Sequence, residues 1–294
     1  CEEVLFLSGL VAWSYIRGLQ PDIHGLEKFM IFGFVNSILR AGAMPPRDMW
    51  FAGEAINYYY YGHFICALLT KLSGIKPSVA YNLMIATLFS LTFSLVFSLA
   101  GNLVYLQARQ AVKKVIAGGL IAASLVTCGG NLHTFIFAHL LPLAKRADLY
   151  GGEIKRYWYP DATRYIGYNP PTDDKTIHEF PCYSFVVSDL HSHVLSIPFV
   201  ISFIALLLAW FVSPAGTRDT RQGSQGFYQP ALLFLLCALL LALFYMTYPW
   251  DLPIYLMLAG LVLLCTEGKR HHAGWKGMAT MYYSWMHKPT RQPG

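Results

Sequence analysis

The stretch VLSIPFVISFIALLLAWFVS occupies residues 194–213 and contains no ionisable side chain. Residues 231–250 and 78–108 are equally free of charge. An uncharged apolar segment of about 20 residues is long enough to cross the hydrocarbon core of a bilayer as a helix. Helices are the expected form, because backbone polar groups in lipid must be satisfied within the segment itself. These three segments predict an integral membrane protein.

The composition of the 294-residue chain agrees with that interpretation. Hydrophobic residues make up 55% of it and charged residues 13%, whereas a soluble domain carries about 25% charged residues. The formal net charge of +6 could indicate nucleic-acid binding, but the basic residues flank apolar segments, so we expect no nucleic-acid partner. Six scattered cysteines predict neither a disulfide framework nor a zinc ribbon. The chain begins at Cys1 without a signal-peptide pattern, which suggests a piece of a longer protein.

The apolar pattern predicts an all-α polytopic bundle of about six to eight transmembrane helices. A weaker candidate at 62–70 ends at Lys71, and 115–144 contains the pair Gly129-Gly130. Two solutions fit this region. In one, 62–75 crosses the membrane and 115–144 forms two short spans, and in the other neither happens. The expected spans are 4–16, 78–107, 115–144, 194–213, 231–248 and 252–266.

Basic residues decide the predicted topology. The loop 214–230 and the tail after residue 266 carry an excess of Lys and Arg, so the positive-inside rule places both in the cytoplasm. Parity then puts the polar loops 17–61 and 145–193 on the outer, extracytoplasmic face. We expect one membrane module at 1–266, and at 267–294 a basic cytoplasmic tail or the start of a further segment.

Apolar residues in 27–41 recur at helical spacing, which predicts an amphipathic helix lying on the outer surface. Just before it stand Asp22 and His24. An acid at this boundary could stay ionised and meet a lipid-linked head group. It could also cap the helix, since Asp is a favoured N-cap residue. The sequence leaves both interpretations of Asp22 open.

A run of four tyrosines, Tyr58 to Tyr61, precedes Gly62-His63. At a membrane border these tyrosines could form an aromatic belt. Helical periodicity would not place all four on one face, so their hydroxyls and His63 could instead donate hydrogen bonds to a phosphate or a sugar. The same loop also carries Arg47, Asp48, Glu54 and Asn57.

Asp189, His191 and His193 alternate just before the apolar segment at 194. In an extended backbone all three point to one side, a spacing suited to a divalent metal or an anionic group. The alternative is a set of polar loop residues that prepares a helix start. Glu179 lies earlier in the same loop, and Trp250-Asp251 follows a span on the same predicted face. Trp250 could be an interface anchor.

These clusters, in this order, resemble the YYY-type membrane protein family of archaea and Chloroflexi-like bacteria. The resemblance covers nearly the whole chain from Pro21 to Asp251 and implies a prokaryotic plasma membrane, but no activity by itself. It rests on Asp22-x-His24-Gly25-x-Glu27-Lys28, Asn57-Tyr58-Tyr59-Tyr60-Tyr61-Gly62-His63, Tyr81-Asn82, Glu179-Phe180-Pro181, Asp189-Leu190-His191-x-His193 and Trp250-Asp251.

More distantly, the chain resembles the GT-C superfamily of membrane glycosyltransferases, which use polyprenyl-phosphate-linked sugars. Those enzymes carry an acid in the first outer loop, then a surface helix and a Pro-rich stretch. Here Asp22, the helix at 27–41 and Pro45-Pro46 fall in that order. The chain departs from the pattern, because Asp22-Ile23-His24 replaces an acid pair and the tyrosines stand where Pro-Pro-Leu is usual. The likeness implies sugar transfer from a polyprenyl-phosphate donor at the outer face, in contact with membrane lipid.

In that enzyme Asp22 would be the general base, and groups such as Arg47 and His63 would hold the donor phosphate. We expect the clusters to converge, with Asp22 and His191 roughly 10 Å apart. The candidate catalytic residues are Asp22, His24, Asp48, Glu54 and Asp189. The candidate substrate-binding residues are Glu27, Lys28, Arg47, Asn57, Tyr58, Tyr59, Tyr60, Tyr61, His63, Glu179, Trp250 and Asp251.

Two other functions stay open from the sequence. One is a transporter, although its usual signature, ionisable residues inside spans, is missing from the sequence pattern. The other is a metal-dependent membrane hydrolase that uses Glu179 with the alternating cluster. A divalent metal is the one cofactor that the sequence suggests, and its candidate ligands are Asp189, His191 and His193.

Overall fold

The computed structural model describes residues 2–107, 111–153, 157–164, 166–168, 170–212 and 225–286. Helices make up 72% of the structure, and the only pairing of extended backbone among the described residues is in isolated bridges. The prediction of an all-α protein is therefore confirmed. Contacts divide the chain into one unit at Cys1–Pro198 and a second at Phe199–Gly294. The boundary that the sequence suggests at 266 stays a prediction.

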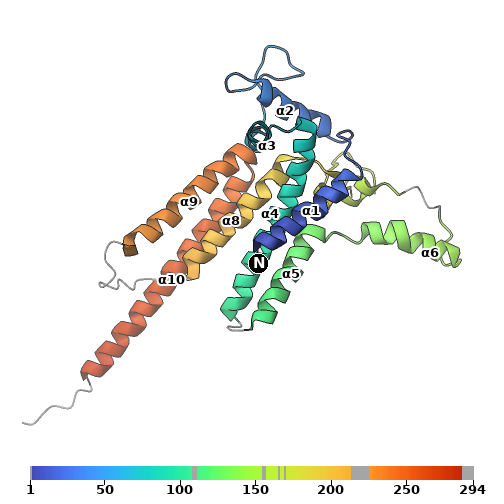
Figure 1. Cartoon of the computed structure of the whole chain (residues 1–294). Helices are drawn as coiled ribbons and strands as arrows, with labels where there is room; N and C mark the ends of the chain where they lie inside the picture. The colour runs from blue at the N-terminus through green and yellow to red at the C-terminus, as the bar shows by residue number, and fades with distance from the viewer. Residues whose placement is uncertain are drawn as a thin grey trace, which may run out of the picture. The chain divides into compact units, whose positions relative to one another are not determined.

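The first unit is organised around the long helix α4 (Pro77–Gln107), against which α1 (Glu2–Gly18) and α5 (Val112–Cys128) both pack (Figure 1). Small residues and aromatic rings make these contacts close. The ring of Trp13 on α1 stacks on Phe89 of α4 with centroids 4.0 Å apart. A Cβ on Gly119 of α5 would lie 2.7 Å from the Phe97 ring, so only glycine fits there without a shift.

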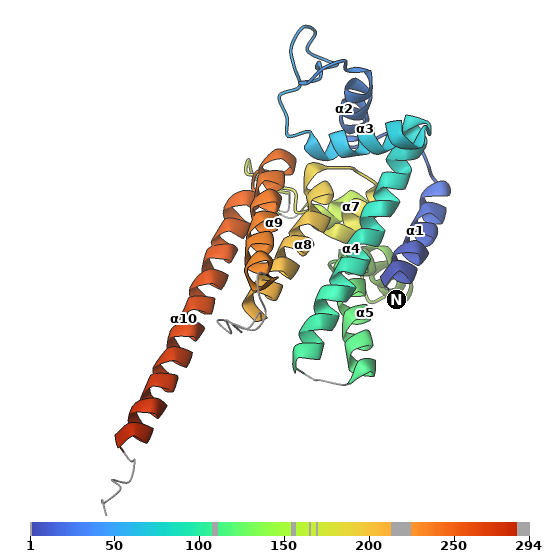
Figure 2. The same cartoon turned by 60° about the vertical axis from the view of Figure 1, so that its left-hand side comes forward.

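Two short helices, α2 (Lys28–Arg40) and α3 (Tyr61–Ser73), lie at one end of α4, and α3 runs across the axis of α4 (Figure 2). α2 begins and ends within one residue of the predicted amphipathic helix, and it buries Ile31, Phe34, Val35 and Ile38 on one face. The period of the apolar residues therefore predicted this helix correctly.

The structure combines parts of the two solutions for 62–144. α3 has 13 residues, about 20 Å of helix, which is too short to cross a hydrocarbon core of about 30 Å. The expected break at Gly129-Gly130 is present, because α5 ends at Cys128. Beyond it come a π-helical turn at Phe135–Leu140 and α6 (Leu141–Arg146).

The rest of the first unit brings the turn that carries Asp189 and His191 against the core. A 3-10 turn at Tyr159–Thr163 and α7 (Pro181–Val187) precede the start of α8 (Ser192–Val212). Ser188 ends α7 in the left-handed conformation, with φ of 58°. The connecting turn, residues 188–191, buries Leu190 among core residues of α2, α3 and α4.

The second unit contains the later part of α8 with α9 (Gln225–Thr247) and α10 (Asp251–Met286). Its core gathers the rings of Phe203, Phe244 and Tyr255, and the Phe203 and Phe244 centroids are 5.4 Å apart. α10 continues past the predicted end of the last span at residue 266 and stays helical to Met286. The start of the predicted tail is thus part of a helix.

Three described helical segments are long and apolar enough to cross a membrane: Pro77–Gln107, Ser192–Val212 and Asp251–Gly268. Ala231–Thr247 is a shorter apolar helix. The first two agree with the predicted spans at 78–107 and 194–213 within two residues at each end. The count of six to eight spans and the side on which each loop lies remain predictions.

Candidate functional site

Two buried side chains hold the turn at 188–191 in place by hydrogen bonds to its backbone. The Nε2 atom of His63 on α3 lies 3.1 Å from the Leu190 carbonyl oxygen, to which it donates. The Tyr81 hydroxyl on α4 donates to the Ser188 carbonyl and accepts the Leu190 N–H, both at 3.3 Å. His63 and Tyr81 are fully buried. This hydrogen bond gives His63 a positioning role in the turn. Its predicted role in substrate binding stays a prediction.

Glycine at position 62 explains how α3 comes this close. A Cβ there would lie 2.7 Å from a methyl carbon of Leu195 on α8. Separations below 3.0 Å require something to move, so a larger residue would push α3 away from α8. The Gly-His pair after the tyrosine run thus has a packing reason of its own.

Four side chains form a continuous chain of contacts, which we call the acid–histidine cluster: Glu27, His191, His193 and Glu179. Glu27 Oε2 lies 2.6 Å from His191 Nε2. The Nδ1 atoms of His191 and His193 are 3.0 Å apart, and His193 Nε2 lies 3.1 Å from Glu179 Oε2. Glu179 also accepts a hydrogen bond of 3.2 Å from the Ser184 hydroxyl. The cluster joins the polar loop 17–61 to the polar loop 145–193.

The acceptors around the two rings dictate where the protons lie. A carboxylate only accepts, so each Nε2 must carry a proton toward Glu27 or Glu179. The contact between the two Nδ1 atoms needs one proton, donated by one ring to the other. The two rings thus form a chain of hydrogen bonds that ends on a carboxylate at each side.

The two acids beside this pair have pKa values shifted in opposite directions. Burial on its own would raise the pKa of Glu179, but the hydrogen bond from His193 and the charges of both histidines outweigh it and hold that pKa below its ordinary value. Burial raises the pKa of Asp189 to about 6, opposed by His191 and reinforced by Glu179 and Glu27. Asp189 is only 4% exposed, and its Oδ1 has no hydrogen-bond partner among the described residues.

One cation interacts with Asp189, and a second lies close to the first. Lys28, at the start of α2, is half-buried, and burial and then the charge of Arg17 lower its pKa while Asp189 acts against that shift. Arg17, at the end of α1, is buried and donates to Asn82 Oδ1 through Nε at 3.1 Å and Nη2 at 2.7 Å. Its Nη1 makes no hydrogen bond to any residue that the structure describes.

Asp22 and Arg17 line one cavity of about 610 Å³, the Asp22 cavity, at the ends of α1 and α4. Apolar side chains make most of its wall, among them Ile23, Phe32 and Leu83. Asn82 closes it by donating to the Pro21 carbonyl at 3.0 Å, which fixes the loop that carries Asp22. The cavity is therefore mostly apolar, with one buried cation and one acid in its lining.

Asp22 does not cap the surface helix. The N-cap residue of α2 is Glu27, and its side chain makes no capping hydrogen bond either. The capping interpretation of Asp22 is therefore wrong. The physical reason is the left-handed turn at Gly25 and Leu26, with φ of 77° and 49°, which separates Asp22 from the helix start. His24, in the same loop, is exposed.

Tyrosines of the run have separate environments. Tyr58 and Tyr59 stack with centroids 4.1 Å apart, and Tyr58 packs near Phe34 of α2. Burial raises the pKa of Tyr58. Tyr60 packs against the core, whereas Tyr61 begins α3 and stacks on Phe64. Neither a uniform aromatic belt nor a uniform row of hydroxyl donors describes them.

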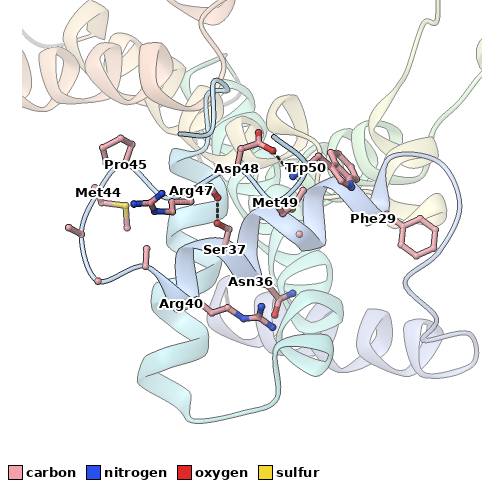
Figure 3. Close-up of a pocket in the computed structure, with 14 residues that line it drawn as sticks. Phe29, Asn36, Ser37, Arg40, Met44, Pro45, Arg47, Asp48, Met49 and Trp50 are labelled. Carbon is pink, nitrogen blue, oxygen red and sulfur yellow. Dashed lines mark hydrogen bonds between the residues drawn. The ribbon is translucent and has the colours of Figure 1, made fainter. Parts of the chain in front are cut away.

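A second, larger cavity, of about 1100 Å³, lies along α2 and the loop after it (Figure 3). We call it the Arg40 groove. Asp48, a predicted catalytic residue, accepts the N–H groups of Trp50 and Phe51 at 2.8 and 2.9 Å, and its catalytic role stays a prediction. Ser37 donates to the Arg47 carbonyl, and Ile56 N–H donates to Pro46 at 3.0 Å. The groove is lined by Phe29, Gly33, Asn36, Ser37, Arg40, Ala41, Gly42, Ala43, Met44, Pro45, Arg47, Asp48, Met49 and Trp50.

The remaining candidates lie outside these sites. Glu54 and Asn57 are exposed, and Glu54 enters the loop ladder only through its backbone, where its carbonyl accepts the Asp48 N–H at 2.9 Å. Trp250 and Asp251 belong to the second unit, where Asp251 begins α10. Their assignment to a substrate site stays a prediction.

Sequence reasoning missed two residues of the site. Arg17 was taken only as the boundary of the first apolar segment, although a cation at the end of a span next to a polar loop is a signal in itself. Ser184 gave no signal, because its contact with Glu179 depends on the turn of α7.

The metal prediction finds no geometric support in the part of the chain that the structure describes. There, no group of three His, Cys, Asp or Glu side chains is arranged to hold a metal ion. The two histidines turn their Nδ1 atoms to each other and their Nε2 atoms to carboxylates. The predicted ligand set of Asp189, His191 and His193 stays a prediction.

Fold and site together define a helical membrane protein with a polar centre at one end of a long apolar helix. The chain belongs to the family described as "Uncharacterized membrane protein (DUF2298)", which it matches over residues 2–289. No curated protein and no solved structure matches the chain.

Proposed function

We propose that this protein is a membrane glycosyltransferase of the GT-C kind that transfers a sugar from a polyprenyl-phosphate donor at the outer face of a prokaryotic plasma membrane. The observation that carries the proposal is the contact between the polar loops 17–61 and 145–193. Glu27 contacts His191 across 164 residues of sequence, beside the cations Lys28 and Arg17. Ionisable groups with no shared task have no reason to converge at the border of an apolar helix.

The Asp22 cavity suits a lipid-linked phosphate. Its apolar wall continues from α1 and α4, the helices that carry long apolar faces, so it can accept the first isoprene units of the donor. Arg17 lines the same cavity with its Nη1 free of hydrogen bonds to the described chain. A guanidinium is suited to a phosphate oxygen, and it stays charged when buried.

Asp22 is the general base in this proposal. Its carboxylate accepts the proton of the acceptor hydroxyl, whose oxygen attacks the anomeric carbon of the donor sugar. The bond between that carbon and the phosphate oxygen breaks, and the electron pair leaves with polyprenyl phosphate. Arg17 and Lys28 stabilise the charge that develops on the leaving phosphate. The acid–histidine cluster fixes Glu27, and through it the start of α2, next to Lys28.

The two other functions lack an observation in their favour. A metal-dependent hydrolase needs a ligand set, and the described residues do not supply one. A transporter is expected to carry ionisable groups at the middle of its spans. The ionisable groups of this site lie in loops and at helix ends instead.

The test is Asp22→Asn in the full chain, purified in detergent and supplied with a polyprenyl-phosphate-linked sugar. Asparagine keeps the size of the side chain but accepts no proton, so we expect the transfer rate to fall by about 10²–10⁴-fold. The unfolding temperature should stay unchanged, because Asp22 makes no capping hydrogen bond. Asp173→Asn, at an exposed loop residue, is the matched control and should keep full activity. Full transfer by a well-folded Asp22→Asn protein would remove Asp22 as the base.

A further inference from the structure

We infer that the Arg40 groove binds the acceptor and that the acceptor is an acidic saccharide, held by Arg40 and Arg47 and stacked on Trp50. This inference rests on the proposed sugar transfer, since it names the second substrate of the same site. It starts from a cavity that no step of the proposed donor chemistry uses.

The charges of the groove favour an anion. Arg40 and Arg47 are both exposed, and neither guanidinium makes a hydrogen bond or ion pair with a residue that the structure describes. The one acid in the lining, Asp48, has an oxygen already engaged by two backbone N–H groups. Two unpaired guanidinium groups facing one cavity match carboxylate or phosphate groups of a ligand.

The other walls favour a sugar over a simple ion. Trp50 is 66% exposed and Phe29 is 62% exposed, although large aromatic rings gain by covering their faces. A pyranose ring presents a flat array of C–H groups that can lie on an indole face. Asn36 donates to Phe32 of its own helix at 2.8 Å, which leaves its Oδ1 able to accept from a sugar hydroxyl. Figure 3 shows Asn36 and Arg40 projecting from α2, and Trp50 toward the Phe29 end.

The size of the groove fits several sugar units. Its volume is about 1100 Å³, and its lining extends along α2 from Phe29 to Arg40. These twelve residues of helix, joined by eleven steps of 1.5 Å, span about 16 Å. The floor is built for close packing, because a Cβ on Gly33 would overlap the Met49 sulfur that lies there. An oligosaccharide would therefore lie along the helix rather than enter a deep hole.

Phe29 connects the groove to the proposed chemistry. Its side chain lines both the Arg40 groove and the Asp22 cavity. A saccharide in the groove therefore ends at the wall of the cavity that holds the base. The two cavities differ as the sites of two different substrates should, since the Asp22 cavity is mostly apolar with a single cation, whereas the groove has more polar lining and two cations.

The experiment measures binding without turnover. The full chain in detergent is titrated with a galacturonate trimer, with maltotriose as the neutral saccharide of equal length, and the dissociation constant is read by calorimetry. We expect the acidic trimer to bind and maltotriose not to bind. The affinity for the acidic trimer should decrease at high salt. Arg40→Ala, Arg47→Ala and Trp50→Ala should each weaken binding by about tenfold. Phe51→Ala and Arg146→Ala are the matched controls, since both residues are exposed but outside the lining, and they should bind normally.

The results separate this inference from the proposed function. If the trimer binds through Arg40, Arg47 and Trp50 but no sugar is ever transferred, the groove stands and the transferase fails. The groove assignment is overturned if maltotriose binds equally well or if Phe51→Ala weakens binding as much as Trp50→Ala. It is also overturned if vesicles of phosphatidylglycerol, and no saccharide, compete for the two arginines, because the groove would then be a lipid head-group site.

Discussion

The acid–histidine cluster joins Glu27 to His191 across 164 residues of sequence, whereas the Arg40 groove is lined entirely by residues 29–50. The cluster stands on buried side chains from α3 and α4, and the groove is a loop folded over one helix. Long-range contacts order the turn that carries His191. The groove depends on local hydrogen bonds and on exposed rings. We therefore expect substitutions under the cluster to change global stability and substitutions in the groove to change local order and binding.

The largest effect should come from Asp189, which sits beneath the cluster. Its pKa of about 6 in the folded protein lies above its ordinary value of 3.8. The folded state therefore keeps a proton that the unfolded state loses, and stability falls as pH rises from about 4 to about 6. Above pH 6 the cost is about 3 kcal/mol, from roughly two pH units. Asp189→Asn removes this cost, so the variant should be more stable than wild type at pH 7 and equal to it at pH 4.

The measurement is the unfolding temperature in detergent between pH 4 and pH 8. Asp173→Asn, at an exposed residue, should follow the wild-type curve. A destabilised Asp189→Asn protein at pH 7 would mean that the ionised carboxylate is needed by Lys28 or His191. The cluster would then be held by charge rather than by burial.

Tyr81→Phe is expected to have the next largest effect. The change deletes one hydroxyl and leaves the Ser188 carbonyl and the Leu190 N–H buried without their partner. We expect a loss of about 2 kcal/mol of stability, visible as a lower unfolding temperature. Tyr105→Phe is the control on the same helix, because Tyr105 is 53% exposed. Equal stability of the two variants would show that the turn does not depend on α4.

The contact between Glu27 and His191 should contribute less, because the Glu27 side chain is 56% exposed. A double-mutant cycle with Glu27→Gln and His191→Gln should give a coupling free energy of about 1 kcal/mol that decreases with salt. The same cycle between Glu27 and His178, an exposed histidine, should give none. A coupling near zero for the first pair would leave Glu27 as a surface residue.

Local sequence patterns predicted the helices. They did not predict which residues of different helices and loops contact one another. The charge-free segment at 78–107 became Pro77–Gln107, and the helical period at 27–41 became Lys28–Arg40. Hydropathy and period are properties of neighbouring residues, so both were visible in the sequence. The Glu27–His191 pair was not, because it depends on how α2, α4 and α7 pack.

The ends of helices were also difficult to predict from the local sequence. The apolar pattern ends near residue 266, whereas the helix α10 continues to Met286. Charged residues can end a membrane-spanning segment while the backbone stays helical, because many polar residues also favour a helix outside lipid. The sequence also allowed Asp22 to cap α2, and the left-handed turn at Gly25 and Leu26 prevents it. The roles of the individual candidate residues depend on such packing and stay predictions.

The smallest effect is expected in the groove loop. The Asp48 carboxylate accepts the N–H groups of Trp50 and Phe51 and so fixes the turn that presents the Trp50 ring. Asp48→Ala deletes both bonds, but water can replace them at an exposed turn, so the cost is about 1 kcal/mol or less. We expect unchanged unfolding temperature and about fivefold faster amide hydrogen exchange at Trp50 and Phe51. Glu54→Ala is the control, because Glu54 joins the loop ladder through its carbonyl and keeps it after the change. If Asp48→Ala lowers the unfolding temperature as far as Tyr81→Phe does, the loop is part of the global fold, and the distinction between cluster and groove is lost.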